Sequence, residues 1–367
     1  MKIDLDSVQE RVIEQYKHLS PYLPAIFFIG GFFFDIATLG RIDNIMNIVS
    51  HGVYLACTMA LLILQIIGYH PAPDSGKIKK YFFEYLNDAI HFMLGALLNA
   101  FVIFYFKSGS FINTFLLVVI LFTLLVMNEV EFFKKQGPTL KVILFTISLS
   151  SFFVYLIPVM IGEAGGGIFM LSQICAIFVL LGMWQVLAHL GTDPARIKNR
   201  ILIPAGTVIL VFSILYAARI IPPIPLALKQ IGIYHNVKHQ DGEFILTTTT
   251  PPWKFWSQGD QDFSAQPDDR IYLFTRIFAP GGFHGKLYLH FQIKDRKGDW
   301  QTTDKIPMNI VGGRDEGFRG YAYKKNYREG KWRALVETDE GREVGRIDFE
   351  VTKTEADPER QLFKEIQ

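Results

Sequence analysis

Ionisable side chains inside apolar stretches are the first candidates for chemistry in this chain. Residues 30–43 read GGFFFDIATLGRID, so Asp35 follows three phenylalanines, and Arg41 and Asp43 lie just beyond. A carboxylate within a membrane span is costly and is by default a candidate for a ligand or proton site. The alternative is a structural acid, either exposed at the interface or paired with Arg41. That pair would be six residues apart, short of two helical turns, so the arginine would have to fold back.

Two further polar residues extend this candidate site. His51 lies in SHGVY and Glu163 lies in GEAGGG, where glycines allow backbone conformations that other residues rarely adopt. The orientation derived below places both near the same end of the helices as Asp35. We therefore predict an outer ligand-binding cluster, with a flexible surface loop as the alternative for Glu163. Its members are Asp35, Arg41, Asp43, His51 and Glu163.

Metal chemistry was weighed against the same pattern. Seven spans with membrane His and Asp resemble intramembrane hydrolases related to ceramidases, and this chain offers His51, Asp88, His91 and His189. His51 falls at the outer ends of the predicted spans, whereas the other three fall at the inner ends. The last predicted span, 201–220, contains no histidine. We therefore expect neither a metal site nor another cofactor.

Tryptophans in the polar half are candidates for partner binding. Trp253 and Trp256 lie in PPWKFW, and Trp300 lies in GDW, both loop-like segments. Exposed aromatic side chains can stack on sugars or anchor a protein partner. The alternative is that they fill the ends of a sandwich. Trp332 alternates with polar residues in KWRALVET and is expected in the core.

The composition indicates which elements must position these residues. Half of the 367 residues are hydrophobic, 32 are phenylalanine and 20% are charged. The net charge of +2 gives no global basic field for nucleic acid. Residues 21–220 are almost continuously apolar, and residues 235–367 are rich in charge and turns. This division predicts a membrane domain followed by a soluble domain.

Seven apolar runs are long enough to cross a bilayer. They cover residues 21–39, 47–68, 88–106, 111–128, 140–161, 168–190 and 201–220. Twelve Lys and Arg residues lie on one side of the predicted bundle, in the N-terminal segment and the second, fourth and sixth connections, counting the flanking Lys141. The connections on the other side carry only Arg41 and Lys107. The positive-inside rule therefore places the N-terminus in the cytoplasm and, after seven spans, the C-terminal half outside.

The remaining segments complete the predicted organisation. Residues 1–20 form a cytoplasmic amphipathic segment, either an interfacial helix or a short helix that caps the bundle. Residues 21–221 form the transmembrane domain, and 222–234 a proline-rich linker. About seven short antiparallel strands follow in 235–354, which favours an all-β, sandwich-like extracytoplasmic domain. The clearest is KLYLHFQIK, where Leu287, Leu289, Phe291 and Ile293 alternate with polar side chains. Residues 355–367 are predicted to be a charged tail.

Two patches resemble a family of uncharacterised bacterial membrane proteins with a C-terminal domain of unknown function. They are GGFFFDIATLGRID at 30–43 and GKWRALVETDEGREVGRIDFEV at 330–351. The resemblance implies a multi-pass protein of the bacterial inner membrane and a periplasmic domain, but no activity.

The sequence contains no Ser-His-Asp order, phosphate loop or paired-cysteine metal motif. We therefore expect a non-enzymatic protein embedded in the lipid bilayer, with a role in binding, sensing or scaffolding. Its external domain would contact an envelope protein or glycan. The alternative is a transporter or intramembrane enzyme that uses the outer cluster around Asp35 and Glu163.

Overall fold

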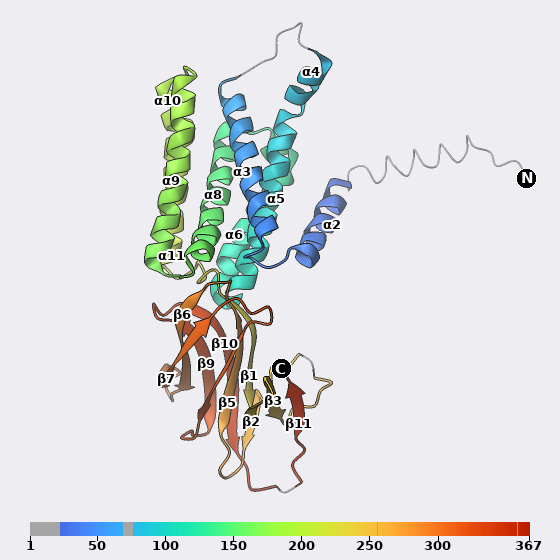
Figure 1. The fold of residues 1–367 in the computed structure, drawn as a ribbon, viewed down its shortest axis with the longest axis vertical. Helices are drawn as coiled ribbons and strands as arrows, with labels where there is room; N and C mark the ends of the chain where they lie inside the picture. The colour runs from blue at the N-terminus through green and yellow to red at the C-terminus, as the bar shows by residue number, and fades with distance from the viewer. Residues whose placement is uncertain (1–22, 69–75, 110, 255, 358) are drawn as a thin grey trace, which may run out of the picture.

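The chain has a helical half and a β-sheet half, which meet end to end (Figure 1). The computed structural model describes residues 23–68, 76–109, 111–254, 256–357 and 359–367. The predicted N-terminal amphipathic segment, residues 1–20, lies outside the described residues.

The described helices lie between Leu23 and Ala217. Their bounds are α2 Leu23–Thr38, α3 Ile45–Ile66, α4 Lys77–Glu84, α5 Leu86–Ser108, α6 Phe111–Glu129, α7 Glu131–Lys134, α8 Pro138–Ile161, α9 Gly166–His189, α10 Pro194–Ile197, the π-helical turn η1 Lys198–Leu202 and α11 Ile203–Ala217.

Within the described ranges, five helical segments are long and apolar enough to cross a membrane. They are α3, α5, α8, α9 and the continuous stretch Pro194–Ala217 that contains α10, η1 and α11. The predicted spans at 21–39 and 111–128 coincide with helices α2 and α6, for which the described apolar parts are Leu23–Thr38 and Thr114–Glu129. The helical membrane-type half is therefore confirmed, with five candidate spans where seven were predicted.

Local sequence explains where these helices begin and bend. The Asn44 side chain accepts a hydrogen bond from the backbone N–H of Met46 and caps α3. Helix α8 starts with Pro138 in its first turn and ends at Gly162, whose φ of +80° is the left-handed conformation that favours glycine. The π-helical turn η1 ends two residues before Pro204, which lies in the first turn of α11 and has no N–H to continue the ladder.

Helices α5 and α8 form the centre of the bundle. About 70% of the apolar part of each of these two helices is buried in the protein. The corresponding share is 33% for α9 and 22% for Pro194–Ala217. The outer helices expose large apolar side chains, including Phe178, Leu210 and Ile214. An apolar surface of this kind is compatible with contact to lipid.

The described part of the C-terminal half contains eleven strands. Their bounds are β1 Ala227–Tyr234, β2 Asn236–Gln240, β3 Glu243–Thr248, β4 Asp262–Ala265, β5 Ile271–Phe278, β6 His284–Lys294, β7 Trp300–Val311, β8 Phe318–Lys324, β9 Gly330–Thr338, β10 Glu343–Lys353 and β11 Phe363–Ile366. All seven predicted strands are present, and the inward side chains of β6 are buried as expected. Trp332 is also buried, which confirms its place in the core.

The strands form three sheets. Their orders are β4-β10-β9-β6-β7, β1-β5-β8 and β11-β3-β2. The five-stranded sheet and the β1-β5-β8 sheet share one apolar core, to which Phe291, Trp332 and Phe349 contribute from the first and Ile233 and Leu273 from the second. All strand pairs are antiparallel except β4 with β10.

Two predicted boundaries are wrong. The expected linker 222–234 contains β1, which pairs with β5 along its whole length, because the chain enters the sheet directly after Pro225. The expected tail 355–367 contains β11, which pairs with β3. The β-domain therefore begins before residue 235 and ends after residue 354, outside the predicted range on both sides.

Candidate functional site

The predicted outer cluster is divided in the structure. Arg41 and Asp43 form a close pair, in which Arg41 Nε donates to Asp43 Oδ1 at 2.9 Å and Nη2 donates to Oδ2 at 2.7 Å. Arg41 also pairs with Asp315 of the β-domain, and its guanidinium lies 5.1 Å from the ring centre of Phe278. Asp43 accepts a hydrogen bond from the backbone N–H of Gly281 at 3.3 Å. These two residues thus join the bundle to the β-domain.

Asp35 has a different partner. Its carboxylate accepts a hydrogen bond from the Asn99 side chain of α5, and Arg41 is not its ion-pair partner. The proposed fold-back of Arg41 onto Asp35 is therefore wrong. Sequence reasoning missed Asn99, although an amide in the middle of the apolar run LLNAFV was a detectable signal.

His51 and Glu163 do not complete a common site with Asp43. His51 is buried between aromatic rings, 5.7 Å from the centre of Phe101 and 5.9 Å from that of Phe104. Glu163 is exposed in the connection between α8 and α9. Asp35 and His51 line one cavity, but Glu163 does not.

The inner-end polar residues form structural hydrogen bonds. His91 Nδ1 lies 2.8 Å from Asn128 Oδ1, and Asn128 returns a bond to the His91 carbonyl at 2.8 Å. His189 Nδ1 faces the Gln185 carbonyl of its own helix at 2.8 Å. Within the described ranges, no three His, Cys, Asp or Glu side chains gather where they could hold a metal ion.

The second predicted site, the tryptophan loop, is the segment 251–259 between β3 and β4. Trp253 and Trp256 each expose 63% of their surface, and their ring centres lie 5.8 Å apart in an edge-to-face arrangement. The alternative that these two fill the end of a sandwich is therefore wrong. Trp300 differs, because it is half-buried and the Arg333 guanidinium lies 4.1 Å from its ring centre.

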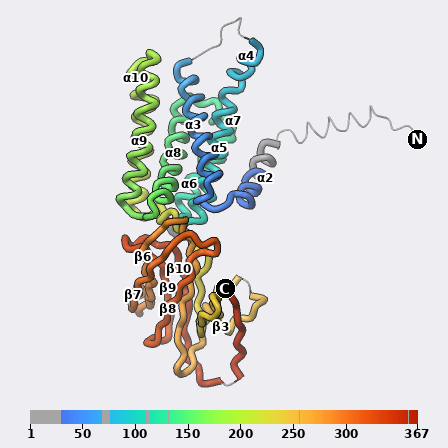
Figure 2. The backbone as a smooth tube through the Cα atoms, in the orientation of Figure 1, coloured from blue at the N-terminus to red at the C-terminus, as the bar shows by residue number. Residues whose placement is uncertain are grey.

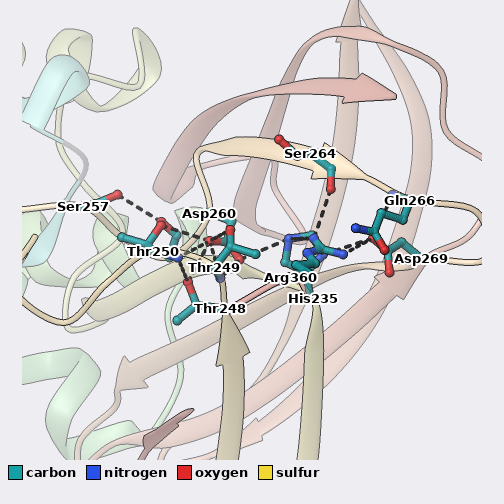
Figure 3. Close-up of polar contacts among 11 residues, drawn as sticks. His235, Thr248, Thr249, Thr250, Ser257, Asp260, Ser264, Gln266, Asp269 and Arg360 are labelled. Carbon is teal, nitrogen blue, oxygen red and sulfur yellow. Dashed lines mark hydrogen bonds and ion pairs between the residues drawn. The ribbon is translucent and has the colours of Figure 1, made fainter. Parts of the chain in front are cut away.

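Asp260 ties together the two ends of the tryptophan loop (Figure 3). Its side chain is fully buried and accepts hydrogen bonds from the hydroxyls of Thr248, Thr249 and Thr250 at 2.7–2.9 Å. The backbone N–H groups of Thr249 and Thr250 donate to the same carboxylate, each at 2.9 Å. A buried carboxylate with this many donors is well compensated for its lost hydration. The loop consequently has a fixed base.

His235 and Arg360 extend this polar cluster toward Asp269. His235 lies 3.5 Å from both Asp260 and Asp269, and Arg360 bonds Asp269 at 2.7 Å. Burial lowers the pKa of His235 to about 4; the neighbouring Arg360 acts in the same direction, and the two aspartates oppose it. Neutral His235 is thus the favoured form near pH 7. The TTTT run at 247–250 was the available signal for this cluster, which sequence reasoning missed.

A second contact joins the β-domain to the bundle. Glu340, in the turn between β9 and β10, accepts a hydrogen bond from the Gly166 N–H at the start of α9 at 2.6 Å. The Arg342 guanidinium lies 3.4 Å from the ring centre of Tyr216 and donates to the Tyr216 carbonyl at 3.0 Å. Burial alone would raise the pKa of Glu340, but the Gly166 N–H and Arg342 outweigh it and lower that pKa. The two halves of the chain are therefore held together at separate points.

Known proteins were then compared with the chain. Residues 284–351 match the family described as "Protein of unknown function (DUF2914)". The match runs from the first residue of β6 into β10 and so covers the central strands of the five-stranded sheet. This domain lies in the C-terminal region that was expected to carry a domain of unknown function. No curated protein matches the chain.

Solved structures gave only distant similarities. A β-glucosidase from Kluyveromyces marxianus aligns at 9% identity over 37% of this chain and 15% of its own, with a TM-score of 0.18. The Pseudomonas fluorescens alkylpurine DNA glycosylase AlkC, bound to DNA containing an abasic site analog, aligns at 10% identity over 85% of this chain and 100% of its own, with a TM-score of 0.22. Such low TM-scores do not indicate a shared fold.

Proposed function

We propose that this chain is a non-enzymatic protein of the bacterial inner membrane whose external β-domain binds another envelope component through the tryptophan loop. The proposal rests on the exposure of Trp253 and Trp256, 63% each, on a loop whose base is fixed by the buried side chain of Asp260. Tryptophan is enriched among residues that dominate binding energy at interfaces. A pre-ordered loop also loses less conformational entropy on binding than a flexible one.

The distribution of charge supports an external position for the β-domain. Helices α4 and α10 lie at the end of the bundle remote from the β-domain (Figure 2). That end carries nine basic residues among the described ones: Lys77, Lys79, Lys80, Lys134, Lys135, Lys141, Arg196, Lys198 and Arg200. The end beside the β-domain carries three basic residues among the described ones: Arg41, Lys107 and Arg219, which lies beside Gly341. Positive residues favour the cytoplasmic side, which would place the β-domain in the periplasm or outside the cell.

The partner is an envelope protein or glycan. Both chemistries use flat aromatic faces, and Lys254, 5.4 Å from the Trp253 ring centre, adds a positive charge beside them. The alternative function, a transporter or intramembrane enzyme around Asp35 and Glu163, has less support because Glu163 does not line the cavity that contains Asp35.

Complementation of a deletion strain tests this proposal. W253A/W256A should reproduce the deletion phenotype at a normal protein level, because it removes the binding surface and leaves the core intact. The matched control is Y321A/Y323A, which removes two other aromatics of the same domain, exposed by 42% and 48%. The control should restore the wild-type phenotype. Full restoration by W253A/W256A would overturn the proposal.

A further inference from the structure

A groove runs along the helical bundle between α2, α3, α5 and α6. Its volume of about 610 Å³ lies within the range of known small-molecule pockets. One part of the wall is polar and contains Asp35, Asn47, Ser50 and Asn99. Another part is apolar and contains Phe32, Phe92 and Leu125. The groove therefore offers both a polar and an apolar surface to one occupant.

The side-chain amide of Asn99 places a hydrogen-bond acceptor without a donor in the polar wall. Its residue surface is only 7% exposed, and its side-chain N–H donates to the Asp35 carboxylate. This orientation is dictated by charge, because the amide oxygen would be repelled by the carboxylate. The amide Oδ1 consequently remains without a hydrogen-bond donor in the described part of the chain. A buried acceptor without a donor is energetically unfavourable.

The charge of Asp35 is also uncompensated by the neighbouring cations. Arg41 is engaged by Asp43 and Asp315. Lys107 donates to the Leu39 carbonyl at 3.3 Å. Among the described residues neither forms an ion pair with Asp35. Lys134 also lines the groove, but it pairs with Glu129 at 3.3 Å. The Asp35 carboxylate and the Asn99 amide oxygen thus lie side by side, and no described cation forms an ion pair with Asp35.

We propose that this groove binds an amphiphile with a protonated amine head. The ammonium N–H groups would donate to the Asp35 carboxylate and to Asn99 Oδ1, and the hydrocarbon chain would lie along Phe32, Phe92 and Leu125. An ammonium group has three donors and can satisfy both acceptors at once. The apolar wall favours an amphiphile over a free soluble cation, because it stabilises a buried hydrocarbon chain.

Binding of a defined pair of probes tests this site in the full-length protein, reconstituted in nanodiscs of zwitterionic lipid. Radiolabelled dodecylamine and 1-dodecanol share one hydrocarbon chain and differ in the head group. At pH 7 the wild-type protein should bind dodecylamine at least about tenfold more tightly than dodecanol, relative to empty nanodiscs. D35N should remove this preference. The control E163Q, which changes a carboxylate outside the groove, should retain it.

The variant N99L keeps the carboxylate of Asp35, so it provides a test that does not depend on whether D35N folds. Should D35N elute or melt differently from wild type, N99L is measured in its place, and it should reduce the amine preference severalfold because it removes the amide oxygen. Equal binding of the two probes by the wild-type protein would overturn the proposal. A full amine preference in well-folded D35N, or in N99L, would also overturn it. Equal binding by the wild-type protein would favour a neutral, protonated Asp35 whose O–H donates to Asn99 Oδ1, whereas an amine preference kept in D35N would mean that another group binds the amine.

Discussion

The carbonyl of Gly162 accepts a hydrogen bond from the backbone N–H of His284 at 2.9 Å. This bond joins the residue after α8 to the first residue of β6. A Cβ atom on Gly162 would lie 2.4 Å from the Gly282 carbonyl oxygen, so the two halves approach here as closely as glycine permits. Together with the Arg41–Asp315 and Glu340–Gly166 contacts, this bond fixes how the β-domain is presented by the helices.

Gly162→Ala should loosen this junction. Its φ of +80° is unfavourable for alanine by about 1–2 kcal/mol, and the contact with Gly282 adds to that. Amide hydrogen exchange of residues 281–284 should become faster in the purified protein. The control Gly167→Ala has no atom within 4 Å of its Cβ and should exchange as wild type does. Unchanged exchange in Gly162→Ala would contradict a tight junction.

Asp260→Ala should destabilise the β-domain by about 3 kcal/mol or more, because it leaves several buried donors without their acceptor. Asp260→Asn should have a smaller effect, since its amide oxygen can still accept some of these bonds. The change is measured by thermal unfolding followed through tryptophan fluorescence. Asp262→Ala, at an exposed position two residues away, should shift stability by less than about 0.5 kcal/mol. Equal effects of Asp260→Ala and Asp262→Ala would argue against an anchoring role for Asp260.

The β-domain should lose stability in acid through His235. The folded-state pKa is about 4, below the ordinary value of 6.5, so the unfolded chain takes up a proton before the folded one. The β-domain therefore has its full stability above about pH 6.5. Its free energy of unfolding falls by up to about 3 kcal/mol as the pH drops toward 4. Unfolding temperatures of wild type and His235→Gln measured between pH 7.5 and 4.5 should converge at the acid end. A constant difference across this range would rule out His235 as the source.

Local patterns predicted much of the β-domain but few of its boundaries. The alternation in β6 is visible within one strand, because period-two burial depends only on neighbouring residues. Strand β1 was hidden by Pro222, Pro223 and Pro225, which predict an extended linker and end just before the strand begins. Strand β11 is short and charged, and its pairing with β3 depends on residues more than a hundred positions away.

The polar partnerships were even less accessible from sequence. Asp35 and Asn99 are 64 residues apart, on different helices, so neither residue alone indicates the other. Asp260 looks like an ordinary loop acid in QGDQD, yet its threonine partners lie across the tryptophan loop. The exposure of Trp253 and Trp256 depends on how that loop leaves the sheet, and composition does not determine it.

Replacement of the loop tryptophans should leave the fold intact. Trp253→Ala and Trp256→Ala each remove a mainly exposed side chain and should change the free energy of unfolding by less than about 0.5 kcal/mol. Trp332→Ala should instead cost about 3–5 kcal/mol, because it empties a fully buried core position. Thermal unfolding of the three variants distinguishes a binding surface from a structural plug. A large loss of stability in either loop variant would favour the plug.

The most direct test of the account is the side of the membrane on which the β-domain lies. A reporter active only in the periplasm is fused after Gln367 through a flexible linker. The linker is needed because the Gln367 carbonyl accepts a hydrogen bond from Arg319 at 2.8 Å, and the pairing of β11 should not be disturbed. A second fusion carries a reporter active only in the cytoplasm. The account predicts an active periplasmic reporter and a silent cytoplasmic one. The reverse result would contradict the external β-domain and, with it, the proposed binding to an envelope component.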